Sequence, residues 1–344
     1  MSLKKETREE IKRYILRHIA QADSKVIPKT VDAYGVSRTT VNNYLRTLLA
    51  SGVITRSGNS RASYALVNKV SVFSYDTEKK LQEDSIFQSD ILPLLSSLKG
   101  NAQEIWKYSF TEMMNNAIEH ASAGRIIVRV LQNALSTTML IMDDGIGIFN
   151  KIREYYAKAE GEELSLDEVV SMLFAGKVTT DKQHHSGEGI FFTSRIMEDF
   201  IICSEKKIFS HDVFDDVLFD ADLSAMTHGT IVSMSLENET NREAAEIMNN
   251  YADVDRGFFR TQIPIAHVFP APGPVSRSEA RRLLAMIVKF QVATLDFSGV
   301  ESIGQGFTHE LFIVFRRSCP DIDFECINMN EKVKNMILRV QNTT

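Results

Sequence analysis

The first 70 residues carry a helical spacing of apolar positions that ends in two short strand-like runs. Apolar residues recur every three or four positions over residues 6–22, which predicts an amphipathic helix. The same spacing returns over Arg38–Ala50, where Ser37 is a suitable N-cap. Val53–Thr55 and Tyr64–Val67 flank a stretch of serine, arginine, asparagine and glycine, and this order predicts a β-hairpin. We therefore expect a small helical unit that closes with a hairpin.

Strand and helix patterns alternate through the middle of the chain. Apolar and polar residues alternate over Val70–Asp76, and an apolar run covers Ile231–Leu236, so both segments are predicted strands. Between them, the stretch 150–186 is long and mostly polar, with helices predicted only at Ile152–Ala159 and Asp167–Phe174. The middle of the chain is thus predicted to mix strands and helices.

The last 80 or so residues return to a regular alternation of strand and helix. Strands are predicted at Ile263–Val268, Ala293–Phe297 and Asp323–Ile327. A capping box over Ser276–Glu279 opens a helix that continues to about Phe290. This order predicts a small α/β layer structure.

Length and composition place the chain among ordinary globular proteins with two or three domains, at 344 residues with 44% hydrophobic and 24% charged residues. No apolar run has the length of a membrane span, and the polar N-terminus does not read as a signal peptide. Cys203, Cys319 and Cys326 have no metal-ligand spacing, so we expect free thiols in a reducing cytoplasm.

Charge is distributed unevenly along the chain. Residues 1–70 carry 13 Lys/Arg against 5 Asp/Glu, a net of +8, and because the whole chain has −6, the remainder carries −14. A basic N-terminal block ahead of an acidic body indicates a module that binds a polyanion.

The first candidate chemistry lies on a predicted helix at Glu112–Ala121. Residues four apart stack on one helical face, so Glu112, Asn116 and His120 are expected near each other. A carboxylate and a carboxamide on one face can position an attacking water and complete a magnesium shell shared with phosphates.

Two glycine-rich turns supply the rest of the candidate site. Ile141–Ile148 is an apolar strand that runs into an acidic turn with Asp143, Gly145 and Gly147. His185–Ile190 is a second glycine turn, which opens onto a predicted helix. Glycines before a helix expose backbone N–H groups that can hold phosphate oxygens.

Together these motifs resemble the ATPase superfamily of gyrase, heat-shock chaperones, histidine kinases and MutL (GHKL), whose last box is matched by His228–Thr230. The resemblance implies ATP and Mg²⁺ as cofactors, with a mobile lid at about 150–186. It implies that Asn116 binds the metal, Glu112 is the base that orients water, and Asp143 accepts from the adenine amino group. The remaining implied nucleotide contacts are Gly145 and Gly147 at the base, Gly187, Glu188 and Gly189 at the phosphates, Lys182 as a charge clamp and Thr230 in support of Asp143. For Lys182, a solvated surface lysine is the open alternative.

The segment between residues 71 and 109 contains no histidine, although histidine kinases carry their phospho-accepting histidine before the ATPase domain. This departure argues against a phosphorelay. The first motif also lacks the lysine that is usual in histidine kinases after Asn-Ala-Ile, which makes it more similar to the anti-sigma-factor serine kinases.

Tyr34–Leu45 resembles a helix-turn-helix, and the following hairpin makes it winged. The second helix of such a unit enters the major groove by its N-terminal residues. The candidate DNA contacts are Arg38, Thr39, Asn42, Asn43, Arg46, Arg56 and Arg61. The alternative is a protein-docking module, but the local charge of +8 favours DNA.

Asp296–Phe307 resembles the core of STAS domains, and residues 276–340 are similar to the STAS-like family of unknown function. In anti-sigma-factor antagonists, a phosphorylated serine begins the helix after this strand. Gly304-Gln305 stands in that place here, without a hydroxyl group. We expect this domain to dock near the lid through the face around Gly304–Phe307.

The combined prediction is a multidomain α+β protein: a winged helix (1–70), a GHKL ATPase domain of the Bergerat type with a mixed sheet (71–245), and a small STAS-like α/β domain (262–344). Its predicted function is an ATP-binding and ATP-hydrolysing transcriptional regulator that binds double-stranded DNA. The alternatives are a serine/threonine protein kinase of the anti-sigma type and a module that holds ATP without turnover. Expected partners are a protein bound through the STAS-like domain and a second copy of the chain, with no membrane and a cytoplasmic location.

Overall fold

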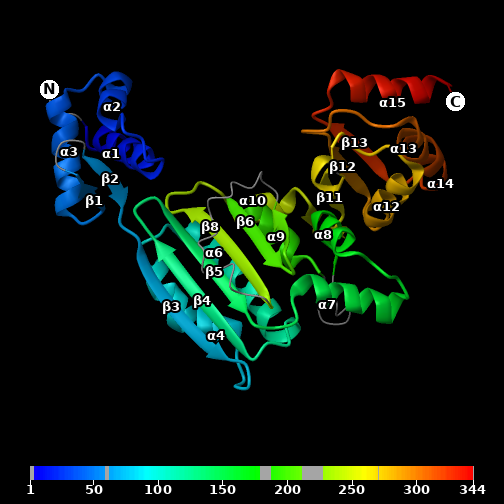
Figure 1. Ribbon diagram of the computed structural model, residues 1–344, viewed down its shortest axis with the longest axis horizontal. Coiled ribbons are helices and arrows are strands. Elements are labelled where there is room, and N and C mark those ends of the chain that lie inside the picture. Colours follow the sequence, from blue (N-terminus) through cyan, green and yellow to red (C-terminus); the bar gives the residue numbers. More distant parts are fainter. Residues whose placement is uncertain (1–3, 59–61, 179–186, 211–227, 270, 344) are drawn as a thin grey trace.

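The computed structural model describes residues 4–58, 62–178, 187–210, 228–269 and 271–343, which form three successive units (Figure 1). The N-terminal unit contains α1 (Lys5–Ala20), α2 (Val26–Tyr34), α3 (Arg38–Ala50), β1 (Ile54–Ser57) and β2 (Ser63–Leu66). β1 and β2 form an antiparallel hairpin. The predicted bounds of the third helix are confirmed, because the hydroxyl of Ser37 accepts a hydrogen bond from the backbone N–H of Thr40.

The N-terminal unit has a hydrophobic core of its own, in which Ile11, Ile15, Val41 and Leu45 are almost fully buried. These residues come from α1 and α3, and their helical spacing puts them on the facing sides of the two helices. A separate core allows the unit to keep its fold wherever it is placed against the rest of the chain.

The central unit is built on a sheet with the strand order β3-β4-β5-β8-β6-β7 among the described residues. Its strands are β3 (Lys69–Asp76), β4 (Arg125–Gln132), β5 (Ser136–Asp143), β6 (Asp199–Ser204), β7 (Lys207–Ser210) and β8 (Thr230–Glu237). Its helices are α4 (Glu83–Ile86), α5 (Leu92–Leu95), α6 (Gly100–Asn115), α7 (Ile148–Tyr155), α8 (Leu166–Ala175), α9 (Gly189–Ile196) and α10 (Ala244–Asn249). A short antiparallel pair, β9 (Ala252–Asp253) and β10 (Gly257–Phe258), follows α10.

The prediction of a mixed sheet in this unit is wrong for the described strands, because each of their neighbouring pairs is antiparallel. After β5 the chain passes through α7, α8 and α9 and returns to the sheet as β6. In the strand order, β6 lies two positions from β5, which leaves one strand position between them. β8 then fills the gap and runs antiparallel to both β5 and β6. β5 and β6 therefore point the same way without pairing.

Helices cover one face of this sheet, and the side chains that alternate towards them are buried. Ile126, Val128 and Val130 of β4 and Met139 and Ile141 of β5 are at most 2% exposed. On the other face of the edge strand β3, Val70 and Val72 are 49% and 61% exposed. This alternation is typical of an antiparallel sheet with one covered face.

The C-terminal unit is a parallel sheet of β11 (Arg260–Pro264), β12 (Val292–Asp296) and β13 (Asp323–Ile327), with β12 in the middle of the described strands. Its helices are α11 (Ile265–Val268), α12 (Arg277–Ile287), α13 (Gln305–His309), α14 (Arg316–Ser318) and α15 (Glu331–Thr343). The capping box of Ser276 and Glu279 is present at the start of α12.

One strand prediction in this unit is wrong in its last four residues. The strand expected over Ile263–Val268 starts at Arg260 and ends at Pro264, and the last four residues form α11. A short apolar run has no periodicity that separates a buried strand from a buried helical turn. Ile265 and Val268 are buried as neighbours on one helical face instead.

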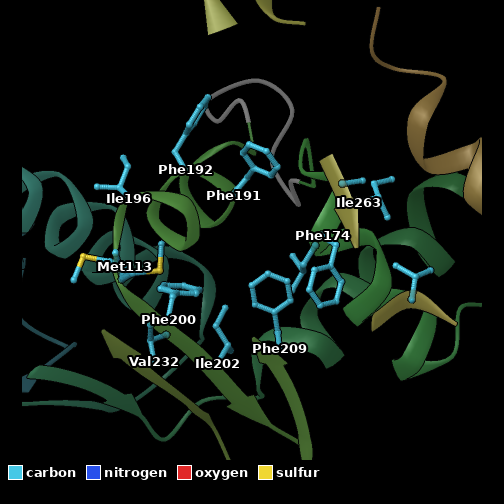
Figure 2. Close-up of a cluster of buried hydrophobic side chains, with 14 of the residues drawn as sticks. Met113, Phe174, Phe191, Phe192, Ile196, Phe200, Ile202, Phe209, Val232 and Ile263 are labelled. Atoms are coloured by element: carbon cyan, nitrogen blue, oxygen red, sulfur yellow. The ribbon is translucent and has the colours of Figure 1, made fainter. Parts of the chain in front are cut away.

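The central and C-terminal units share one continuous hydrophobic core. Figure 2 shows part of it, with Ile263 of β11 on the side of Phe174 of α8, whose ring centre lies 4.7 Å from that of Phe209 of β7. The expected docking through Gly304–Phe307 is wrong. α8 packs against β11, α11 and α12, whereas α13 packs against α12 and α15.

The N-terminal unit touches the central unit where β8 ends and β5 begins. Arg17 Nη2 lies 2.9 Å from Glu237 Oε2, and Arg13 Nη2 lies 3.2 Å from Glu239 Oε2. Leu135, just before β5, packs against the core of the N-terminal unit. Within the described ranges, no helix combines the length and the apolar character needed to cross a bilayer.

Candidate functional site

Segments from α6, β5, α7, α9 and β8 enclose a cavity of about 320 Å³ in the central unit. Its polar lining consists of Glu112, Asn115, Asn116, His120, Asp143, Lys151, Gly187, Glu188, Gly189 and Thr230. Its apolar lining consists of Met113, Ala117, Ala121, Ile141, Ile148, Ile152, Val178, Ile190 and Val232. The three motifs that lie far apart in the sequence therefore meet around one cavity.

Asp143 is the last residue of β5 and is only 5% exposed. Its Oδ1 accepts hydrogen bonds from the backbone N–H groups of Gly145, at 2.9 Å, and Thr230, at 3.3 Å. Burial raises the pKa of the carboxyl group to about 6 in spite of these bonds. The side chain of Thr230 is a further hydrogen-bond partner of this carboxylate, and the two oxygens of a carboxylate have room for an additional donor from a ligand in the cavity.

Asp144, the next residue, belongs to the structure of the turn. Its Oδ1 accepts from the backbone N–H groups of Gly124 and Arg125, at 2.8 and 2.9 Å. These bonds hold the start of β4 to the turn after β5. Of the two adjacent carboxylates, only Asp143 lines the cavity.

Gly145 and Gly147 serve close packing, and neither is among the described residues that line the cavity. A Cβ at Gly145 would collide with the backbone carbonyl of Ala121, and one at Gly147 would collide with the side chains of Ser204 and Glu205. Gly147 also has a φ of +86°, which favours glycine. These glycines bring the turn against neighbouring elements, so the structure places them beside the site.

The α6 motif enters the cavity through a helix that changes its winding. α6 is regular to Asn115 and continues as a π-helical turn over Asn116–His120. Such wider turns recur at functional sites in helices. Here the turn brings Asn115 and Asn116 to the cavity together with Glu112 and His120, one asparagine more than helical spacing alone predicted.

Glu112 lies against the N-terminus of α9. Its carboxylate occupies the place that a Cβ at Gly189 would take, so Gly189 must be glycine if both groups keep their positions. Gly187, with a φ of +71°, and Glu188 lead into this helix and also line the cavity. The free N–H groups and the dipole at a helix N-terminus favour an anion.

Lys151 of α7 is a cavity residue that the sequence analysis missed. No ion pair joins it to a residue in the described part of the chain. A cation without a protein partner in a cavity with a helix N-terminus suits a phosphate ligand. Its position four residues after Gly147, in the predicted lid and directly before the predicted helix Ile152–Ala159, was the available sequence signal.

The loop after α8 is tied to the C-terminal unit. Lys177 donates to the carbonyl of Lys289 at 3.1 Å, and its ammonium lies 4.6 Å from the ring centre of Phe290. Gly176, with a φ of +83°, packs so closely on Phe258 that a Cβ would collide with the ring. Lys182 lies outside the described residues.

The described residues contain no cluster of three or more His, Cys, Asp or Glu side chains that would hold a metal ion. Magnesium sites for nucleotides commonly use one or two protein ligands, with phosphate oxygens and waters completing the octahedron. The carboxamide of Asn116 and the carboxylate of Glu188 fit a shell of that kind.

The candidate DNA contacts form an accessible surface on the N-terminal unit. The exposed members are Arg38, Thr39, Asn43, Arg46 and Arg56; Asn42 is half-buried, and Arg61 lies outside the described residues. Asn42 uses its side-chain amide to donate to the carbonyl of Arg38. α3 lies on the outer side of the unit, away from the central sheet (Figure 1).

The position of the phospho-acceptor serine in STAS antagonists has no hydroxyl group in this chain, because Gly304-Gln305 stands there and Gln305 is exposed. Gly304 precedes α13 and packs so closely on Val275 that a Cβ would collide with its backbone. Thr308 is fully buried and donates to the carbonyl of Gly304. Thr308 is therefore a helix residue of the core rather than an accessible acceptor.

Comparison with known families identifies the C-terminal unit. Residues 279–334 match the family described as a STAS-like domain of unknown function (DUF4325). This range covers most of α12, the strands β12 and β13, and the start of α15. A search of curated proteins finds no match to the chain.

Proposed function

We propose that the chain is an ATP-dependent regulator in which a GHKL-type ATPase domain and a winged helix that binds duplex DNA accompany the STAS-like domain. The observation that carries this proposal is the convergence of Glu112, Asp143 and the N-terminus of α9 on one cavity. Taken singly, none of these groups identifies a nucleotide site. Their combination matches the separate needs of adenine, phosphates and magnesium.

Each part of ATP finds a suitable surface in this cavity. The adenine ring would lie among Ile141, Ile148 and Val232, with its amino group donating to Asp143. The phosphates would lie at Gly187–Gly189, near Lys151. Asn116 would hold magnesium, which would supply Lewis-acid stabilisation of the charge on the phosphates.

Hydrolysis is the proposed reaction because Glu112 stands beside the proposed phosphate site. A carboxylate at the N-terminus of α9 can orient a water towards the terminal phosphate. The protein-kinase alternative needs an acceptor hydroxyl, and the usual STAS position carries Gly304 and Gln305. A kinase would therefore act on a partner protein.

The proposed DNA reader is the N-terminal unit. Its order of three helices and a hairpin suits a winged helix. Arg38, Arg46 and Arg56 are exposed and have no ion pair with a described residue. Two of the basic residues counted in the local charge, Arg13 and Arg17, instead pair with the central unit.

Calorimetric titration with MgATP tests the nucleotide proposal. Asp143→Asn should weaken binding by about tenfold or more, since a hydrogen bond to a charged group contributes about 1.5–3 kcal/mol. Asn116→Ala should weaken MgATP binding, and the loss should shrink when EDTA removes the metal. Asn249→Ala, on the exposed end of α10, is the control that should bind like the parent protein. Unchanged affinity in both site variants would show that the site is misplaced.

A further inference from the structure

A second cavity, of about 270 Å³, lies between the central unit and the STAS-like domain. One wall comes from the end of the α7 helix, the loop after it and α8. The other wall comes from α12, with Val268 between them. Its apolar lining is Tyr156, Leu164, Met172, Ala175, Val178, Val268, Ala285 and Met286. This volume is near the lower limit for small-molecule sites, which start at about 300 Å³, so it suits a ligand of one or two rings.

The charged residues that line the cavity include one carboxylate more than they include cations, and the ammonium of Lys177 lies outside this lining, on the carbonyl of Lys289. Three carboxylates, Glu160, Glu162 and Glu168, stand against two cations, Arg282 and Lys289. Arg282 Nη1 lies 3.9 Å from Glu168 Oε1, so the charges of these two side chains offset one another. Glu168 is also engaged by the backbone N–H and hydroxyl of Ser165, in a capping box.

Three helices end at this cavity, and helix C-termini carry partial negative charge. The α7 helix continues as a π-helical turn to Glu160, α8 ends at Ala175, and α12 ends two residues before Lys289. The carbonyl of Lys289 already accepts from the ammonium of Lys177. The aromatic ring of Tyr156 and the sulfur atoms of Met172 and Met286 add surfaces that suit an apolar ring or a cation.

We propose that this cavity binds a small apolar molecule with one ammonium group. The rings would lie among the methionines and Leu164, and the ammonium group would face Glu162, which has no ion pair with a described residue. The site is separate from the nucleotide cavity.

The two cavities share a wall at Val178. The residues before it are held by the STAS-like domain, because Thr261 of β11 donates to the carbonyl of Ala175 at 2.7 Å and Lys177 is bound at Lys289. A ligand in the second cavity would therefore contact α8, Gly176 and Val178 together. We expect such a ligand to change the affinity for MgATP. Since this coupling rests on the proposed nucleotide function, it is tested separately from binding of the ligand itself.

The test is calorimetry of the full chain with 1-naphthylmethylamine, against 1-naphthoate as the anion of similar size. The amine should bind at least tenfold more tightly than the carboxylate. Ala285→Trp, at an exposed position of the lining, should abolish binding, whereas Val288→Trp, 51% exposed in the parent protein and outside the lining, should retain it. Glu162→Gln should weaken amine binding several-fold, and its exposed neighbour Glu163→Gln should not.

Equal or tighter binding of naphthoate would overturn the charge assignment, and amine binding that survives in Ala285→Trp would overturn the site. Hydrogen exchange of residues 166–178 should slow when the amine binds, with or without ATP. A change in MgATP affinity on addition of the amine would establish the coupling. An unchanged MgATP affinity would refute the coupling alone, and a chain that binds the amine but no ATP would refute the proposed nucleotide function alone.

Discussion

At the scale of single residues, Asp143 shows how burial changes the acidity of a carboxyl group at the cavity. Its pKa is raised to about 6 because the fold removes water from it, although two backbone N–H groups oppose the shift. The folded pKa lies above the ordinary value of 3.8 for an aspartate side chain, so ionised Asp143 lowers the free energy of unfolding at neutral pH. The protein keeps its full free energy of unfolding below the unfolded pKa, where Asp143 is neutral in both states. Part of that free energy is lost as the pH rises through the folded pKa of about 6. A donor from a ligand would compensate the ionised form.

We therefore predict that ATP binding weakens as the pH falls through about 6, because protonated Asp143 no longer accepts from the adenine amino group. For a pKa of about 6 in the free protein, the affinity should fall about tenfold between pH 7 and pH 5. Titration of ATP against pH, in the parent protein and in Asp143→Asn, measures this. In Asp143→Asn, the contribution of residue 143 to the pH dependence of ATP affinity is removed, and the contribution of the nucleotide's own titration is left. Parallel pH profiles would contradict the role of Asp143.

Glu112 supports a prediction about turnover rather than binding. Glu112→Gln keeps the size of the side chain beside Gly189 but removes the base, so MgATP should still bind while hydrolysis falls by about 10²-fold or more. Glu104→Gln, on an exposed position of the same helix, is the matched control. Phosphate release and radiolabel on protein are measured side by side. Label that stays on a protein would favour the kinase alternative, and unchanged turnover would remove Glu112 from the mechanism.

At the scale of elements, α3 exposes polar residues of its N-terminal part to solvent because its apolar face packs in the core of the N-terminal unit. Val41, Leu45 and Leu48 are buried against the other helices of the N-terminal unit. The opposite face is left with arginine, threonine and asparagine, which can contact bases and phosphates.

We expect the full chain to bind duplex DNA with an affinity that falls steeply with salt, since binding releases counterions from the phosphates. Arg38→Ala and Arg46→Ala should each weaken binding, and a lost base contact costs about 1–3 kcal/mol. Arg316→Ala, in the C-terminal unit, is the control. Gel shifts over a range of salt concentrations measure both effects. Binding that is unchanged in the double variant would favour protein docking by this unit.

At the scale of the whole molecule, two central strands connect the proposed nucleotide cavity with the N-terminal unit. β8 begins at Thr230, in the cavity, and ends at Glu237, which pairs with Arg17. β5 runs from a point next to Leu135 to Asp143. A strand of eight residues spans about 25 Å, so the two sites lie at opposite ends of the same rigid elements.

Coupling between these sites must be reciprocal: DNA should change ATP affinity by the factor by which ATP changes DNA affinity. Glu237→Gln with Glu239→Gln should bring this factor closer to one, while each ligand alone still binds. The effect should be modest, because an exposed ion pair contributes about 0.2–1 kcal/mol. Glu243→Gln with Glu246→Gln is the control at exposed positions nearby. ATP affinity measured with and without a selected DNA site decides the matter, and equal values would exclude coupling.

The sequence by itself determined the local elements and the residue types of the site. The N-cap at Ser37, the capping box at Ser276 and the strand Asp323–Ile327 follow from short-range rules, and each is present in the structure. The spacing of Glu112 and Asn116 likewise predicted that they share a surface, and both line the cavity. Such features depend on backbone geometry within a few residues, which a sequence pattern reports directly.

Only the tertiary structure decided how strands pair and which residues meet across the chain. Whether β6 lies beside β5 depends on the path of the chain through α7, α8 and α9. The residue types of the two strands do not specify whether they pair. The roles of Gly147, which admits Glu205, and of Lys177, which binds the STAS-like domain, depend on partners distant in sequence. Contacts between distant segments come from the packing of whole elements, so local spacing could predict the chemistry of the cavity but not its neighbours.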